Sequence, residues 1–209
     1  MKALAVITQS FAGTPLSTQQ NGQQMRDADL IARLCNADEQ ALEQLYHHYY
    51  TRLFRFIARV TRRDDLIDEI INDVMYVVWE KAASYNPQCK PSAWIFGIAF
   101  NKARQAARNA DRSEEVSLDD IDEDSSWLGK QDAEFGQLEF DDWLVSALGQ
   151  LSPEHRAVIE LTYYESLSYG EIATIMDCPE NTVKTRMHHA RKNLAVILAS
   201  TNDSSSHTN

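Results

Sequence analysis

The chain has 209 residues and carries 31 Asp and Glu against 20 Lys and Arg, which gives a formal net charge of −11. This balance alone argues against a nucleic-acid-binding protein, because polyanionic partners attract basic proteins. An apolar share of 44% excludes global disorder, and only 7 glycines and 5 prolines leave few turn-forming residues, so the composition predicts an all-α protein.

Signals for membrane insertion and disulfide formation are weak. The longest strongly apolar stretch, 94–100, is much shorter than the about 20 residues that a membrane span needs. The three cysteines, Cys35, Cys89 and Cys178, are far apart and form no CxxC pair. We therefore expect a cytoplasmic protein with reduced thiols.

The N-terminal part of the chain predicts a small helical domain. Residues 1–26 are polar and aperiodic, so we expect them to be disordered. Apolar residues at 3- and 4-residue steps then predict a long helix over about 42–60. A short helix near 29–34 precedes it, and a third helix follows over about 64–83.

The predicted third helix is unusually acidic. Carboxylates favour a helix N-terminus electrostatically, which explains Asp64 and Asp65. Asp68, Glu69 and Asp73 continue past the first turn, where the helix dipole no longer accounts for them. Two interpretations follow: a solvated acidic face, or a surface that binds an Arg-rich partner.

The predicted fourth helix has the opposite charge. Pro91 suits a first helical turn, and the helix is expected to run to about Asn109. Basic residues alternate with aromatic ones, a combination that suits phosphate contact and base stacking on single-stranded nucleic acid. The alternative is that the aromatic residues belong to the core. The residues concerned are Lys90, Trp94, Phe96, Phe100, Lys102, Arg104 and Arg108.

The net charge is concentrated in one segment. Residues 111–142 hold 13 acidic and 2 basic residues, whereas residues 1–110 hold 11 acidic and 13 basic ones. With almost no apolar periodicity, this segment predicts an acidic flexible linker between two domains, either as a plain spacer or with a specific function.

The C-terminal part predicts a helix-turn-helix. Ser152 before Pro153 is a helix N-cap, and Ser168 with Glu171 forms a capping box that opens a short helix. Asp177 tolerates left-handed geometry at the turn, and a second helix of about 181–198 follows.

The second helix of this motif has the charge of a DNA-reading helix. Between Asn181 and Lys192 the sequence has four Lys or Arg, two His and no acid. Polar residues near the helix N-terminus suit base edges, and cations suit phosphates. A basic surface helix of a plain bundle is the alternative interpretation.

These motifs together resemble the extracytoplasmic-function (ECF) sigma factors of bacterial RNA polymerase. The stretch 68–79 is similar to the family's core-polymerase-binding helix, and 92–104 is similar to its −10 element helix. The stretches 151–156 and 181–191 are similar to its −35 domain. The resemblance covers about 28–198. Asn181 and Asp177 stand where the family commonly has Gly.

The resemblance implies a sigma factor that binds core RNA polymerase, through its clamp and flap regions, and promoter DNA, under control of an anti-sigma factor. It implies no catalysis, no cofactor, no metal and no membrane insertion. The implied organisation is a disordered segment at 1–26, sigma region 2 at 27–110, an acidic linker at 111–138, sigma region 4 at 139–199 and a disordered tail at 200–209.

The resemblance also assigns site residues. Core polymerase binding is expected at Asp68, Glu69, Asp73 and Trp79. Binding of −10 DNA is expected at Lys90, Trp94, Asn101, Lys102, Arg104 and Arg108. Binding of −35 DNA, through a helix-turn-helix of about 168–188, is expected at Asn181, Thr182, Lys184, Thr185, Arg186, His188, His189, Arg191 and Lys192.

Two other functions remain as alternatives. A stand-alone helix-turn-helix regulator would bind DNA without joining polymerase, but it leaves the acidic and the basic-aromatic helices unexplained. A metal-dependent hydrolase would have to use the histidines, yet no HExxH or comparable spacing exists, and adjacent histidines on a helix point to different sides.

Overall fold

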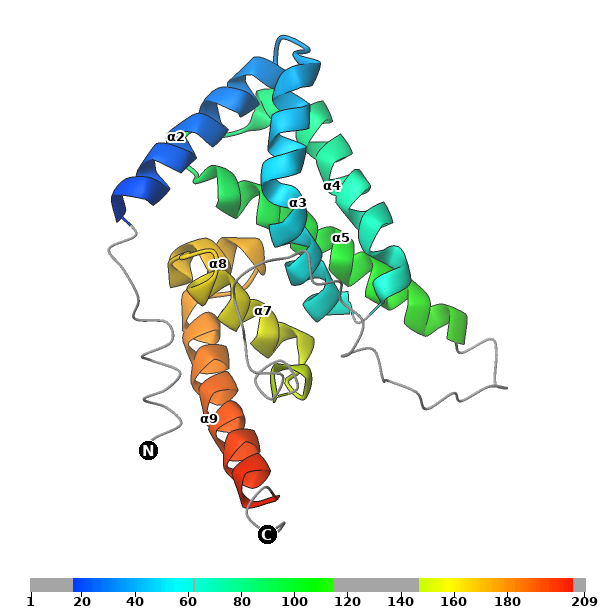
Figure 1. The fold of residues 1–209 in the computed structure, drawn as a ribbon, viewed down its shortest axis with the longest axis vertical. Helices are drawn as coiled ribbons and strands as arrows, with labels where there is room; N and C mark the ends of the chain where they lie inside the picture. Colours follow the sequence, from blue (N-terminus) through cyan, green and yellow to red (C-terminus); the bar gives the residue numbers. More distant parts are fainter. Residues whose placement is uncertain (1–16, 62, 115–146, 205–209) are drawn as a thin grey trace.

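The computed structural model describes residues 17–61, 63–114 and 147–204, and these residues form helices and no strand. This confirms the all-α prediction. Two groups of helices follow one another along the chain (Figure 1). The first group is α2 (Ser17–Leu34), α3 (Glu39–Thr61), η1 (Asp64–Leu66), α4 (Ile67–Glu80), η2 (Ala82–Ser84) and α5 (Pro91–Glu114). The second is α7 (Pro153–Tyr163), α8 (Tyr169–Ile175) and α9 (Glu180–Ser204).

The first domain is built around α3, which packs against α2, α4 and α5. Its buried residues recur at 3- and 4-residue steps, so they form one continuous apolar stripe. Leu45, Leu53 and Ile57 are fully enclosed. Helices α2, α4 and α5 all pack around α3, so the apolar stripe of α3 forms the centre of the core of this domain.

A buried carboxylate ties α2 to α3. Asp27 is only 2% exposed. Its carboxylate accepts hydrogen bonds from the Tyr49 hydroxyl at 2.7 Å and from the Gln23 amide nitrogen at 2.9 Å. Because a buried carboxylate without partners is costly, these bonds fix how α2 lies on α3.

The second domain has the predicted helix-turn-helix. Leu161, Ile172 and Val183, one from each helix, are fully buried where α7, α8 and α9 meet. Asp177 in the turn has φ of 48°, the left-handed geometry expected for it. Ser152 caps α7 by accepting a hydrogen bond from the His155 backbone N–H, as predicted.

The helices extend beyond the boundaries expected from the sequence. Helix α2 begins at Ser17, so residues 17–26 are helical although a disordered segment was expected over 1–26. Glutamine-rich sequence has good helix propensity, which apolar periodicity does not report. Helix α5 continues to Glu114 and α9 to Ser204. The rest of the expected acidic linker lies outside the described residues.

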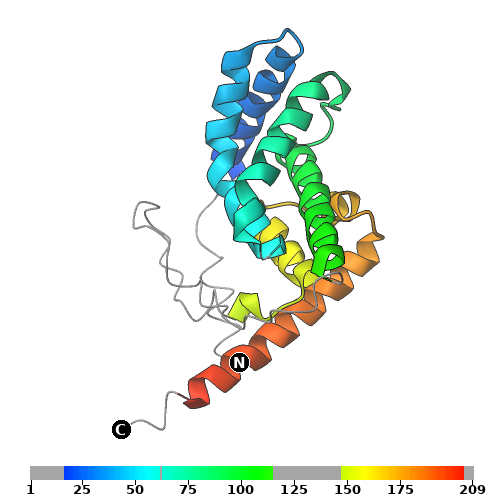
Figure 2. The same cartoon turned by 90° about the vertical axis from the view of Figure 1, so that its right-hand side faces the viewer.

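The two domains are in direct contact. Helix α7 packs on α3, and α8 packs on α5 (Figures 1 and 2). Gly97 lies at this contact, where a Cβ would stand 3.8 Å from Cγ1 of Ile175. Helix α9 extends away from the first domain, which leaves much of its length outside the contact.

Candidate nucleic-acid interfaces

Helix α4 separates an apolar face from an acidic one. Its core face is buried and consists of Ile67, Ile70, Ile71, Val74, Met75 and Val78. Asp68, Glu69 and Asp73 are exposed on the other side, beside Tyr76, whose side chain is 65% exposed. Tyrosine is enriched in protein interfaces, so Tyr76 and the three carboxylates together form a candidate interaction surface.

Trp79 differs from the acidic residues of α4. It is half-buried and packs against the core, so its main contacts are within the domain. Tryptophan is large enough to contribute both to packing and to an exposed rim. Its assignment to core polymerase binding stays a prediction.

The structure joins two surfaces that sequence reasoning treated as separate. The Lys102 ammonium of α5 donates a hydrogen bond to Asp73 of α4 at 2.8 Å. The two side chains are 32% and 54% exposed, so this pair contributes little to stability. It places the acidic face of α4 and the basic face of α5 next to each other.

The aromatic residues of α5 do not act as one set. Phe96 and Phe100 are buried, which confirms the core interpretation for them. Trp94 is half-buried, with its ring centroid 5.1 Å from that of Tyr85. Asn101, Arg104 and Arg108 are exposed, so α5 presents cations and an amide but a single aromatic residue from the predicted set.

The helix-turn-helix presents a basic face on α9. Val183, Met187, Ala190 and Leu194 are buried on one side of this helix. The predicted contact residues lie elsewhere on its surface. Two of them, Thr182 and Arg186, are half-buried. The others are exposed: Asn181, Lys184, Thr185, His188, His189, Arg191 and Lys192.

Three cations of that basic face contact other side chains of the second domain. Lys184 pairs with Glu180 at 2.8 Å, one turn earlier on the same helix. The Arg191 guanidinium stands over the ring of Tyr163 of α7, 5.6 Å from its centroid. An Nη1 of Arg186 lies 3.6 Å from the Cys178 sulfur in the turn.

Sequence reasoning missed His155 as part of this surface. It lies in the first turn of α7, with its ring centroid 6.4 Å from that of His189 on α9. Partial burial, followed by the nearby His189, lowers the pKa of His155. At neutral pH it is therefore an uncharged hydrogen-bonding group beside the basic helix. No spacing pattern in the sequence reveals this pair, because tertiary packing of α7 on α9 creates it.

Glu171 connects the helix-turn-helix to the first domain. Its carboxylate accepts hydrogen bonds from the Ser168 backbone N–H at 2.7 Å, the Ser168 hydroxyl at 2.7 Å and the Lys90 ammonium at 3.0 Å. The capping box predicted from the sequence is confirmed. Partial burial acts to raise the pKa of Glu171, but the hydrogen bonds from Ser168 and Lys90 outweigh it and lower that pKa.

This lowered pKa predicts an acid-dependent contribution to stability. Since the folded pKa lies below the ordinary value of 4.5, the stabilisation is present above pH 4.5 and is lost as the pH falls through the folded pKa. We expect Glu171→Gln, which keeps the cap but not the charge, to be less stable than the unsubstituted protein at pH 7. The difference should vanish in urea titrations at strongly acidic pH, and a difference independent of pH would contradict the assignment.

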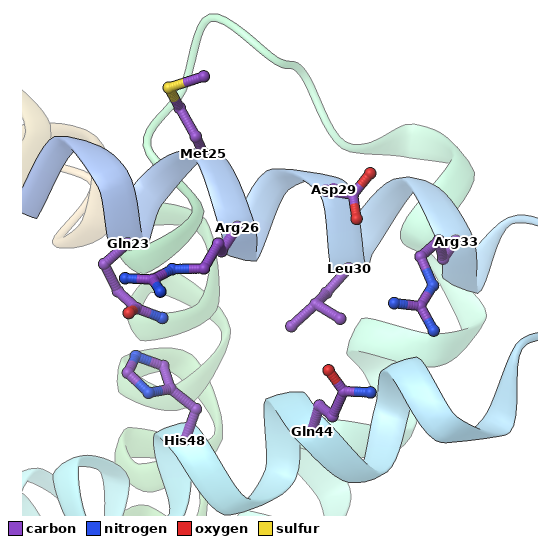
Figure 3. Close-up of a pocket in the computed structure, with 8 residues that line it drawn as sticks. All are labelled: Gln23, Met25, Arg26, Asp29, Leu30, Arg33, Gln44 and His48. Carbon is purple, nitrogen blue, oxygen red and sulfur yellow. The ribbon is translucent and has the colours of Figure 1, made fainter.

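A separate groove lies between α2 and α3 and has a volume of about 510 Å³. In Figure 3, Gln23 and Arg26 on α2 point toward His48 on α3, whereas Met25 points away. None of the residues predicted to bind polymerase or DNA lines it.

The described ranges contain no group of three or more His, Cys, Asp or Glu placed to hold a metal ion. Within those same ranges, no helix combines the length and the apolar character that crossing a membrane requires.

Comparison with known proteins assigns both domains. The family model for Sigma-70 region 2 matches residues 45–113, and that for Sigma-70, region 4 matches residues 141–194. The chain is 29% identical over 165 residues to the ECF RNA polymerase sigma factor SigL of Mycobacterium tuberculosis. This similarity covers 78% of this chain and 91% of SigL. It is 24% identical over 178 residues to the ECF RNA polymerase sigma-E factor of Haemophilus influenzae, over 81% of this chain and 94% of that protein.

Solved structures have the same fold. The sigma factor RpoE, in its co-crystal structure with the anti-sigma factor NepR from Bartonella quintana, matches with a TM-score of 0.64 and 25% identity over 75% of this chain and 96% of RpoE. CnrH, in complex with the cytosolic domain of CnrY, matches with a TM-score of 0.59 and 22% identity over 84% of this chain and 98% of CnrH. The two sigma-70 regions follow one another on the two helical domains, and the similarity to ECF sigma factors covers 91% and 94% of those two relatives. This chain therefore belongs to the ECF sigma factor family.

Proposed function

We propose that this chain binds core RNA polymerase through α4 and directs transcription initiation by reading the −10 and −35 elements with α5 and α9. The observation that carries the proposal is that the two matched sigma-70 regions present an exposed acidic face on α4 and exposed basic faces on α5 and α9. The family is one of transcription initiation factors. The net charge of −11 does not oppose this function, because the acids are concentrated in 111–142.

The acidic face of α4 supports core docking. Asp68 and Glu69 are exposed, while the opposite face of the same helix is buried in the domain. A partner with Arg at the matching positions would gain electrostatic complementarity, which contributes chiefly to specificity and association rate. Asp73 takes part in the same face, with Lys102 as its neighbour.

The two basic helices support different kinds of DNA contact. Helix α5 carries exposed Asn101 and Arg104 and half-buried Trp94, residue types that suit an unpaired strand whose bases stack on aromatic rings. On α9, the exposed residues at the N-terminal end suit base edges of a duplex in the major groove. Two tethered modules raise overall affinity through effective concentration.

Control by an anti-sigma factor is part of the proposal. Its support is the likeness to RpoE, at 25% identity, in a structure that contains the anti-sigma factor NepR. We propose that the protein acts in the cytoplasm, with region 2 over 27–110, an acidic linker over 111–138 and region 4 over 139–199.

Run-off transcription with purified core polymerase tests the proposed function. The full chain is expected to produce a defined transcript from a template that carries its promoter and none from a template with a scrambled −10 element. Core enzyme alone is the control. Failure to bind core in a pull-down, together with tight binding to promoter duplex by the free chain, would favour the stand-alone regulator instead.

A further inference from the structure

A pair of histidines joins α7 to the basic face of α9. These two helices pack against each other (Figure 1). His155 lies in the first turn of α7 and His189 lies on α9, with their ring centroids 6.4 Å apart. His189 is exposed and His155 is half-buried. Because the rings come from different helices, the packing of the domain sets their separation.

The pair extends a face of α9 that is predicted to bind −35 DNA. Thr182, Arg186 and His189 follow one another at 4- and 3-residue steps, so they lie on one side of the helix. Lys192 comes three residues later on that side. The charge of Arg186 acts on His155, which places this histidine beside the same row of residues. A phosphate group at this row is therefore within reach of α7 as well as α9.

Two imidazole rings at this separation can contact one phosphate group. Charge-assisted hydrogen bonds to oxygen are about 2.7–2.9 Å long, so phosphate oxygens fit between rings whose centroids are 6.4 Å apart. Within the described ranges, neither ring makes a hydrogen bond or an ion pair. A protonated imidazole donates from both nitrogens and carries a positive charge, whereas a neutral one has a single donor. An anion between the rings is held more tightly when both are protonated.

The surrounding charges determine how the pair responds to pH. Partial burial, which is the largest effect, and the nearby His189 lower the pKa of His155. Glu154 in the same turn acts to raise that pKa and Arg186 acts to lower it, with a net decrease. His189 has Arg186 on its own helix and the ring of His188 at 5.7 Å. A bound phosphate places a negative charge beside both rings and favours their protonated forms. Binding therefore takes up protons and strengthens as the pH falls.

We propose that His155 and His189 together bind one phosphate of the −35 duplex and strengthen that contact in mildly acidic solution. The identity of the duplex rests on the proposed function, whereas phosphate binding by the pair does not. His155 then belongs to the DNA interface, although it is absent from the residues that the resemblance assigns. Promoter binding through the second domain follows pH as a consequence.

The affinity for DNA as a function of pH tests the pair in the full chain. Fluorescence anisotropy measures binding of the chain at low salt to a labelled duplex of random sequence, because a phosphate contact requires no particular base. The complex of the chain with core polymerase is measured on its promoter in the same way. Each proton taken up changes the affinity by up to about tenfold per pH unit, so we expect an increase of about tenfold between about pH 8 and about pH 6.

The double variant His155→Gln/His189→Gln is expected to lose most of this increase. Glutamine keeps the backbone N–H of residue 155, which donates to the Ser152 hydroxyl, so the cap of α7 is retained. His155→Lys carries a charge that persists at mildly alkaline pH. Its affinity there should rise toward the value that the unsubstituted chain reaches in mildly acidic solution.

The salt dependence provides a readout that a purely structural role of the histidines does not change. One additional neutralised phosphate makes the slope of log affinity against log salt concentration steeper by about 0.9. We expect this steepening when the unsubstituted chain is moved from mildly alkaline to mildly acidic solution. The slope of the double variant should be the same in both solutions.

His47→Gln is the matched control, since His47 is an exposed histidine of α3 that is not among the residues predicted to bind DNA. Circular dichroism at each pH checks folding, and His189→Gln alone replaces the double variant if that one unfolds. Equal pH dependence and equal salt slopes for the variant and the control would overturn the proposal. A histidine-dependent response on the random duplex, from a chain that does not bind core polymerase, would keep the phosphate site and overturn the proposed function. Failure of the unsubstituted chain to bind either DNA would overturn both.

Discussion

Replacing Asp68 and Glu69 by Arg is expected to abolish binding to core RNA polymerase while leaving the fold intact. Both carboxylates are exposed on α4, and the buried face of that helix contains neither of them. Placing two cations against an Arg-rich docking surface turns attraction into repulsion worth several kcal/mol. A loss of about 3 kcal/mol already lowers the affinity more than 100-fold.

The effect on folding should be small. Asp68 accepts a hydrogen bond of 2.8 Å from the Tyr50 hydroxyl, but this contact is exposed and its loss is compensated by water. Glu39→Arg with Glu43→Arg is the matched control, since both residues are exposed on α3 and the change in charge is identical. Affinity for core is measured by fluorescence anisotropy. Equal affinity for the α4 variant and the α3 control would refute docking through α4.

Alanine at Lys184 and Arg186 is expected to lower transcription mainly from promoters that depend on a −35 element. A side chain that contacts a base edge contributes about 1–3 kcal/mol, and loss of a phosphate contact weakens binding to all sequences alike. Lys184 is exposed, and its pair with Glu180 is a surface pair, so removing it costs little stability. Arg186 is half-buried beside Cys178, so its replacement removes one packing contact as well.

Run-off assays on two templates, one with and one without the −35 element, measure this effect. Arg33→Ala provides a control in the first domain, since Arg33 forms a half-buried ion pair with Asp38 at 2.8 Å and is not among the residues predicted to bind DNA. A selective loss on the first template supports base contact. Equal loss on both templates would limit these residues to phosphate contact.

Local features of the fold were predictable because their causes are local. The 3- and 4-residue steps on α3, the N-cap at Ser152 and the capping box of Ser168 and Glu171 each depend on residues close in sequence. The left-handed turn at Asp177 follows from the short side chain of that residue. The resemblance to a known family added the order of the two domains, which the family models confirm.

Partners that are far apart in the sequence were not predictable, because no local pattern identifies them. The pairs Lys102 with Asp73, Lys90 with Glu171 and Arg59 with Glu160 join residues far apart in the chain. A charged residue on a helix surface has the same local signature whether it faces solvent, DNA or another domain. Sequence reasoning therefore identified Lys90 and the cations of α5 without showing that Lys90 and Lys102 already have carboxylate partners.

The three hydrogen bonds at Glu171 are divided unequally between the two domains. Two of its donors belong to Ser168 in the same helical cap, and only the third, Lys90, belongs to the other domain. Departure of Lys90 thus leaves the carboxylate with its local donors, and α8 keeps its first turn. The cap of the helix-turn-helix is thus complete within its own domain and does not depend on contact with the first domain.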